Sequence, residues 1–117
     1  MARLTLRLDF APGQAVGHGK IRLLEAIRDH GSISAAGRSM GMSYRRAWLL
    51  INELNRIFEE PLIDAKHGGP GGGGAELTPF GHRVVQRYRS IERKAHAAVA
   101  ADLDALAAAT LKSQSDC

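Results

Sequence analysis

The sequence has little cysteine, few aromatic residues and no long apolar run. Its one cysteine is the last of 117 residues, which excludes an internal disulfide and fits a reducing compartment. Phe, Trp and Tyr make up only 5% of the chain, so we expect an aliphatic, alanine-rich core of packed helices. No apolar stretch approaches the roughly 20 residues of a membrane-spanning helix, and the N-terminus alternates where a signal peptide is continuously apolar. We therefore expect a soluble, cytoplasmic protein.

The sequence also lacks the residue spacings that are typical of catalytic, metal-binding and cofactor-binding sites. No serine or cysteine has a histidine and a carboxylate at a spacing that would build a nucleophile. The glycine-rich run over residues 68–74 lacks the Lys-Ser/Thr ending of a phosphate-binding loop. The histidines lack metal-ligand spacing; they are His18, His30, His67, His82 and His96. We expect no enzyme, no metal and no cofactor.

The positive charge is concentrated on the body of the chain. The net charge is +4, with 15 Lys/Arg against 9 Asp/Glu in residues 1–94 and 1 against 3 in residues 95–117. A basic body favours a polyanionic partner such as nucleic acid. An excess this small is also common among proteins that bind nothing charged.

The N-terminal third predicts one strand and one amphipathic helix. Apolar residues alternate with polar ones from Leu4 to Phe10, which is the period of a half-buried strand. The following segment, APGQAVGHG, predicts a loop. Over residues 20–30 the apolar residues share one helical face, and Glu25 lies on the opposite, polar face. Gly31 is expected to end this helix.

Two glycines mark a helix-turn-helix. Ser32 is a candidate N-cap for a short helix over residues 33–40, in which Gly37 allows close approach of another helix. Gly41 lies where the chain must turn through the left-handed region. Ser43 then caps a helix over residues 44–58. Two helices joined by a tight glycine turn are typical of a helix-turn-helix.

The outward face of the helix over residues 44–58 suits DNA. Arg45, Asn52 and Arg56 share this face, where base edges and phosphates lie in a major groove. The alternative is an ordinary solvated surface. Leu49 on the same face either meets a thymine methyl group or packs under the next segment. Trp48, at the boundary of the two faces, either packs partly in the core or contacts DNA.

The segments LIDAKH and AELT predict two short strands joined by a glycine-rich tip, which is a wing beside the helix-turn-helix. Lys66 and His67 at its base are candidates for contact with the DNA backbone or minor groove. The bland alternative is a flexible tip without a binding role.

A last helix is expected from Thr78 and Pro79, an N-cap followed by proline at the first helical position. Its apolar stripe has the 3.5-residue period of a coiled coil; the stripe comprises Val84, Tyr88, Ile91, Ala95, Ala98 and Leu103. At about 1.5 Å per residue, the helix is too long to pack entirely on its own domain. We expect it to hold a homodimer.

Four segments resemble one family: GSISAAG, GMSYRRAW, INELN and GGPGGGGAELTPFG. They are similar to the N-terminal DNA-binding domain of the ModE-like, molybdate-responsive repressors, which share their winged helix with LysR-type regulators. The resemblance covers about residues 4–106. It implies a mainly α fold with a small β component: a winged helix-turn-helix with an N-terminal strand, a β-hairpin wing and a long dimerisation helix. The DNA contacts it implies are Ser43, Tyr44, Arg45, Arg46, Trp48 and Asn52.

The expected organisation is a winged helix over residues 1–78, a dimerisation helix over residues 79–109 and a disordered tail over residues 110–117. Family members continue into an oxyanion-binding module, whereas this chain ends in LAAATLKSQSDC. We therefore expect sensing to be absent or supplied by a separate oxyanion-sensing protein. The sequence predicts a homodimeric, sequence-specific regulator of transcription that binds a palindrome in double-stranded DNA. The alternatives are a protein-binding winged helix and an accessory DNA-binding protein without a direct regulatory role.

Overall fold

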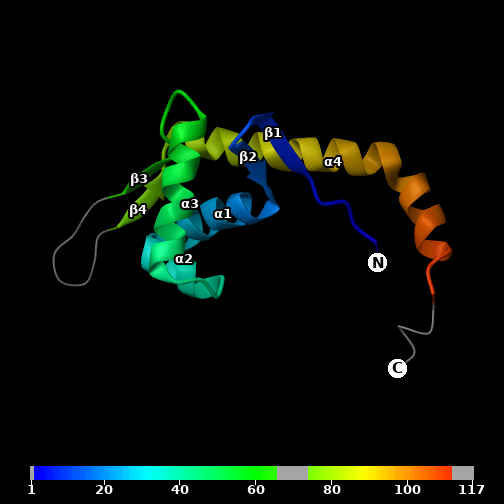
Figure 1. Ribbon diagram of the computed structural model, residues 1–117, viewed down its shortest axis with the longest axis horizontal. Coiled ribbons are helices and arrows are strands. Elements are labelled where there is room, and N and C mark those ends of the chain that lie inside the picture. Colours follow the sequence, from blue (N-terminus) through cyan, green and yellow to red (C-terminus); the bar gives the residue numbers. More distant parts are fainter. Residues whose placement is uncertain (1, 66–73, 112–117) are drawn as a thin grey trace.

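The computed structural model describes residues 2–65 and 74–111. Figure 1 shows a helical body from which a β-hairpin extends on one side and a long helix on the other. The elements, in chain order, are β1 (Arg7–Ala11), β2 (Gln14–Gly17), α1 (His18–His30), α2 (Ile33–Ser39), α3 (Tyr44–Ile57), β3 (Ile63–Ala65), β4 (Ala75–Leu77) and α4 (Pro79–Ala108). This arrangement confirms the predicted winged helix-turn-helix, mainly α with a small β component.

The N-terminal hairpin corrects one expectation. The sequence pattern indicated a single strand followed by a loop, but β1 pairs antiparallel with β2, and α1 begins at His18. Gly13 makes the tight turn between the strands with φ of 77°, a conformation that glycine adopts without strain. Val16, which is 1% exposed, anchors β2 in the core. A four-residue strand is too short to show a clear alternation beside Pro12 and its neighbouring glycines.

The helix-turn-helix is built as its caps predict. Gly31 ends α1 in the left-handed region, and the Ser32 hydroxyl accepts a hydrogen bond from the Ala35 N–H at 3.0 Å. Gly41 has φ of 68° in the turn between α2 and α3. A side chain at Gly37 would come within 3.5 Å of the Ala47 side chain. This is an ordinary van der Waals distance, so α2 and α3 pack closely at Gly37, but the contact does not require glycine, which corrects the expectation for this residue.

The core is aliphatic, as the composition predicts. It joins both hairpins and all four helices; its largest fully buried residues are Tyr88, Ile21, Leu23, Leu24, Ile27, Ile51, Leu54, Leu62 and Val16.

The wing strands β3 and β4 pair antiparallel and lead directly into α4. The Thr78 hydroxyl joins the two elements, because it donates to the Pro61 carbonyl at 2.7 Å and accepts from the Gly81 N–H at 2.9 Å. Pro79 occupies the start of α4 as predicted. Lys66, His67 and most of the expected tail over residues 110–117 lie outside the described residues, so the expectations for them stay predictions.

The first half of α4 belongs to the core of its own chain, which corrects one further expectation. Tyr88, predicted to face a second chain, is 1% exposed, and its hydroxyl donates to the Leu6 carbonyl. Burial raises the pKa of this hydroxyl. On the polar face of α1, Glu25 accepts two hydrogen bonds from Arg89 of α4 at 2.7 and 3.0 Å, a partner that the sequence did not predict. Packing against the same chain produces the same helical period as packing against a partner, so the sequence did not separate the two.

The second half of α4 extends past the body and curves, as Figure 1 shows. Its exposed residues include Leu106, which is 70% exposed. Over residues 2–65 and 74–111, no helix is both long and apolar enough to cross a membrane.

Candidate nucleic-acid interface

Helix α3 separates a buried face from a polar one. Ala47, Leu50, Ile51 and Leu54 are buried against the rest of the domain. Arg45, Arg46, Asn52 and Arg56 are exposed. Because α3 is the second helix of the helix-turn-helix, its free face is the one that such motifs present to a major groove.

The start of α3 is fixed by its cap and by two aromatic rings. The Ser43 hydroxyl accepts from the Arg46 N–H at 3.1 Å, and its own O–H is still able to donate to a phosphate. Tyr44 is 57% exposed, and its ring lies edge-on to Trp48 with the centroids 6.2 Å apart. Trp48 is half-buried and packs against the core. Trp48 therefore packs partly in the core, and it also supports Tyr44 at the free end of the helix.

A shallow groove runs along the outward face of α3. Its lining residues are Arg45, Trp48, Leu49, Asn52, Glu53 and Arg56. Glu53 is the acidic member, and its carboxylate lies 3.6 Å from the ammonium of Lys20. Lys20 is itself held by donating to the Ala15 carbonyl at 2.8 Å. Lys20 thus partly neutralises the negative charge of Glu53, and Arg45 and Arg56 leave the groove with a positive charge.

The helix-turn-helix segment is strongly cationic. Residues 32–57 contain Arg38, Arg45, Arg46 and Arg56 against a single acidic residue, Glu53. Such a density of cations neutralises phosphates and releases their counterions. The α3 N-terminus adds free backbone N–H groups that favour anions.

The described part of the wing contributes no cation of its own. Asp64 and Glu76 are directly opposite in the β3–β4 ladder, and both are exposed. Arg28 lies beside them in a polar depression at the base of the wing. The cations predicted for a contact between the wing and DNA, Lys66 and His67, lie outside the described residues.

Metal binding finds no support in the described ranges, 2–65 and 74–111, since they hold no group of three or more His, Cys, Asp or Glu residues able to bind an ion together.

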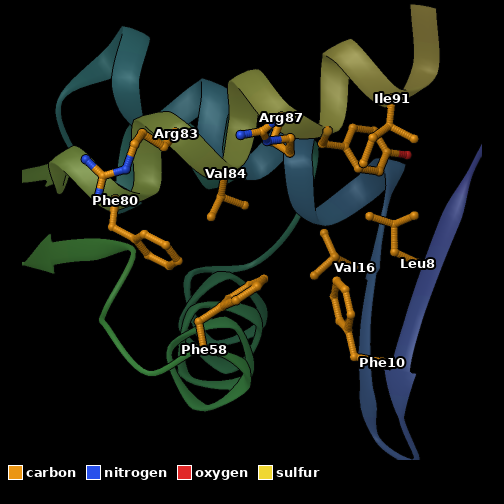
Figure 2. A pocket seen from close by; sticks show the side chains of 10 residues that line it. Leu8, Phe10, Val16, Phe58, Phe80, Arg83, Val84, Arg87 and Ile91 are labelled. Carbon is orange, nitrogen blue, oxygen red and sulfur yellow. The ribbon is translucent and has the colours of Figure 1, made fainter. Parts of the chain in front are cut away.

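A second surface, the apolar groove, lies between the N-terminal hairpin, the end of α3 and the first half of α4. Figure 2 shows the side chains of Phe58, Phe80 and Phe10 projecting into the space between these elements. The rings of Phe58 and Phe10 have centroids 5.7 Å apart, and those of Phe58 and Phe80 are 5.6 Å apart. The lining residues are Leu8, Phe10, Val16, Phe58, Phe80, Arg83, Val84, Arg87, Tyr88 and Ile91.

The apolar groove takes in part of the predicted dimerisation stripe. Val84 and Ile91 line it and are half-buried, whereas Tyr88 lies beneath it in the core. Ala95, Ala98 and Leu103 follow in the second half of α4. Sequence reasoning missed Phe10, which is 55% exposed. Its place in the strand pattern was the available signal, but only the hairpin shows that it lies beside α4.

Comparison with known proteins agrees with this geometry. Residues 18–82 match the family model described as bacterial regulatory helix-turn-helix protein, lysR family. The chain is 42% identical over 92 residues to the molybdenum-pterin-binding protein MopA of Rhodobacter capsulatus, covering 79% of this chain and 34% of MopA. It is 44% identical over 90 residues to the DNA-binding transcriptional dual regulator ModE of Escherichia coli K12, covering 74% of this chain and 34% of ModE. The chain spans about a third of the length of these curated relatives.

Proposed function

Because the chain belongs to the lysR family of bacterial regulatory helix-turn-helix proteins, we propose that it binds specific double-stranded DNA and regulates transcription. The observation that carries the proposal is the exposed face of α3, where Arg45, Asn52 and Arg56 border one groove. The similarity to DNA-binding ModE proteins supports it. A cationic helix-turn-helix surface also explains why the net positive charge lies on the body of the chain.

The side chains of α3 match the chemistry of the major groove. Arginine donates to O6 and N7 of guanine, and the asparagine amide pairs with N6 and N7 of adenine. In the proposed complex, Arg45 and Asn52 read bases, while Ser43 and Arg46 at the start of the helix contact phosphates. Tyr44 and Trp48 position this end, and Arg56 neutralises the backbone farther along. Lys66 and His67 reach the backbone or minor groove beside the wing.

The active species in this proposal is a homodimer held by α4. The apolar groove supports it, because an exposed apolar surface of this kind marks an interaction site. The second half of α4 from a second copy would fill this groove. It carries Leu103 and Leu106 as apolar residues and Asp102 as an acidic one, within alanine-rich turns. Two copies then bind a palindrome whose half-sites lie about one helical turn apart, or a multiple of it.

Charge favours an antiparallel pairing of the two α4 helices. Pairing centred on residue 93 places Ile91 of each copy against Ala95 of the other. Asp102 then lies beside Arg83 and Arg87, which border the apolar groove. The small alanines at 95 and 98 let the helix backbones approach closely where they cross.

The name of MopA, a molybdenum-pterin-binding protein, links this relative to molybdenum, and we propose that the regulated genes are molybdenum-related. Two clusters of donor groups in the sequence suit an oxyanion, at the start of α3 and over residues 66–74, and the DNA proposal already uses both. A separate oxyanion-sensing protein is therefore part of the proposal as a partner.

Selection of bound duplexes from random DNA tests the proposed function. The expected result is enrichment of one palindrome, bound with an affinity that falls steeply as salt rises. An accessory DNA-binding protein would bind without enriching a sequence. A protein-binding winged helix would retain no duplex at low salt, and that outcome would refute the proposal.

A further inference from the structure

Leu49 is an exposed apolar side chain on the face of α3 that is proposed to read DNA. Its side chain is 45% exposed on α3 and lies outside the core cluster. Helix α3 packs mainly on α2, β2 and α1, and the described wing strands leave Leu49 exposed. Within the described residues, packing under the wing is therefore the weaker of the two explanations that the sequence left for Leu49. Phe10 and Tyr44 are also exposed, but each has a ring partner within the chain.

The neighbours of Leu49 define what it meets. Arg45 precedes it by four positions and Asn52 follows it by three, so the three side chains share one helical face, and they line the same groove. Arginine and asparagine recognise the hydrogen-bonding atoms of bases. Leucine has no donor or acceptor, and the apolar group that bases present in the major groove is the 5-methyl of thymine.

We propose that Leu49 is a specificity-determining residue that contacts the 5-methyl group of a thymine in each half-site. The inference rests on the proposed function, since it requires that α3 enter the major groove. Cations on the same face supply the attraction for DNA, and Leu49 adds discrimination that charge does not provide.

The position of the thymine follows from the helix. Leu49 lies about 6 Å along the axis from Arg45 and about 4.5 Å from Asn52, at 1.5 Å per residue. Successive base pairs are about 3.4 Å apart. The thymine is therefore expected one or two base pairs from each of the bases that Arg45 and Asn52 contact.

The test replaces thymine by deoxyuridine, which removes only the methyl group, at each position of the duplex selected by the wild-type protein. Deoxyuridine at the contacted position, and at its symmetric position in the other half-site, is expected to weaken binding about fourfold per half-site through the loss of the methyl contact. Deoxyuridine elsewhere should have no effect. Leu49→Ala should bind the thymine duplex more weakly than wild type and bind the thymine and deoxyuridine duplexes equally. Alanine is the best helix former and the site is exposed, so this variant should melt at the wild-type temperature.

Two further variants make the outcome specific to Leu49. Leu49→Met retains an apolar side chain of similar size and should keep the discrimination against deoxyuridine. Asn52→Ala should lose affinity yet keep the wild-type ratio between the two duplexes. The inference is overturned if wild type ignores every methyl group, or if Leu49→Ala still discriminates. Failure of the proposed function is a different result, because then no duplex sequence is selected at all.

Discussion

Replacing Gly81 by alanine tests how α4 is joined to the wing. Gly81 lies in the first turn of α4, where its N–H donates to the Thr78 hydroxyl at 2.9 Å. An added Cβ would overlap the Leu62 carbonyl oxygen and lie 3.1 Å from the Leu62 carbonyl carbon. These are backbone atoms of the segment between α3 and β3, and the same oxygen accepts from the Thr78 N–H at 2.9 Å. No side-chain rotation relieves the overlap, so the two segments must separate.

The expected loss follows from opposing contributions. Overpacking of this kind destabilises by about 1 to 3 kcal/mol, and weakening the bond between Thr78 and Leu62 adds about 1 kcal/mol. The higher helix propensity of alanine stabilises α4 by about 1 kcal/mol and offsets part of this loss. The net loss in the free energy of unfolding is about 1 to 3 kcal/mol, and each kcal/mol lowers the melting temperature of a domain of this size by about 5 °C.

Urea unfolding followed by circular dichroism measures this loss, with Gly19→Ala as the matched control. Gly19 is also in the first turn of a helix, but an added Cβ there has nothing within 4 Å. The control should be unchanged or stabilised by up to about 1 kcal/mol. If Gly81→Ala is as stable as Gly19→Ala, the close approach of α4 to Leu62 is wrong.

Three further predictions concern ion pairing and assembly. Glu25→Gln should destabilise the domain by about 1 to 3 kcal/mol at pH 7. Hydrogen bonds from Arg89 lower the pKa of Glu25, so the stabilisation by this pair is complete above the ordinary carboxyl pKa and is lost as pH falls through the lowered pKa. The free energies of unfolding of wild type and Glu25→Gln should therefore differ less at pH 3 than at pH 7. An equal difference at both pH values would contradict the pairing. Ile91→Asp should give monomers by light scattering at micromolar concentration, with weak DNA binding; a persisting dimer would refute the role of the apolar groove. Arg87→Asp should weaken the dimer and added Asp102→Arg should restore it; failure of this rescue would exclude the antiparallel pairing.

Local signals made much of the fold predictable. Few residue types suit a helix cap or a left-handed turn, and the sequence has such residues at Gly31, Ser32, Gly41 and Ser43. The predicted ends of these helices therefore lie close to the observed ones. The outward face of α3 was predictable for the same reason, because its period is set by residues within a few turns of one another.

Contacts between distant segments were not predictable. Glu25 and Arg89 are 64 positions apart, and the Tyr88 hydroxyl reaches a carbonyl 82 positions away. An apolar stripe on α4 has one period whether it packs on its own hairpin or on another chain, so Tyr88 was assigned to the wrong surface. The apolar groove likewise needs β1, α3 and α4 together, and no single stretch of sequence contains it.

Fluorescence anisotropy with the selected palindrome and a scrambled duplex tests the central claim most directly, namely that the exposed face of α3 reads DNA sequence. Asn52→Ala should lose about 1 to 3 kcal/mol on the palindrome, while its affinity for the scrambled duplex stays at the wild-type value. Lys66→Ala is the control for backbone contact and should weaken both duplexes and flatten the salt dependence. If Asn52→Ala weakens both duplexes equally, or neither, the face of α3 does not read sequence and the account is contradicted.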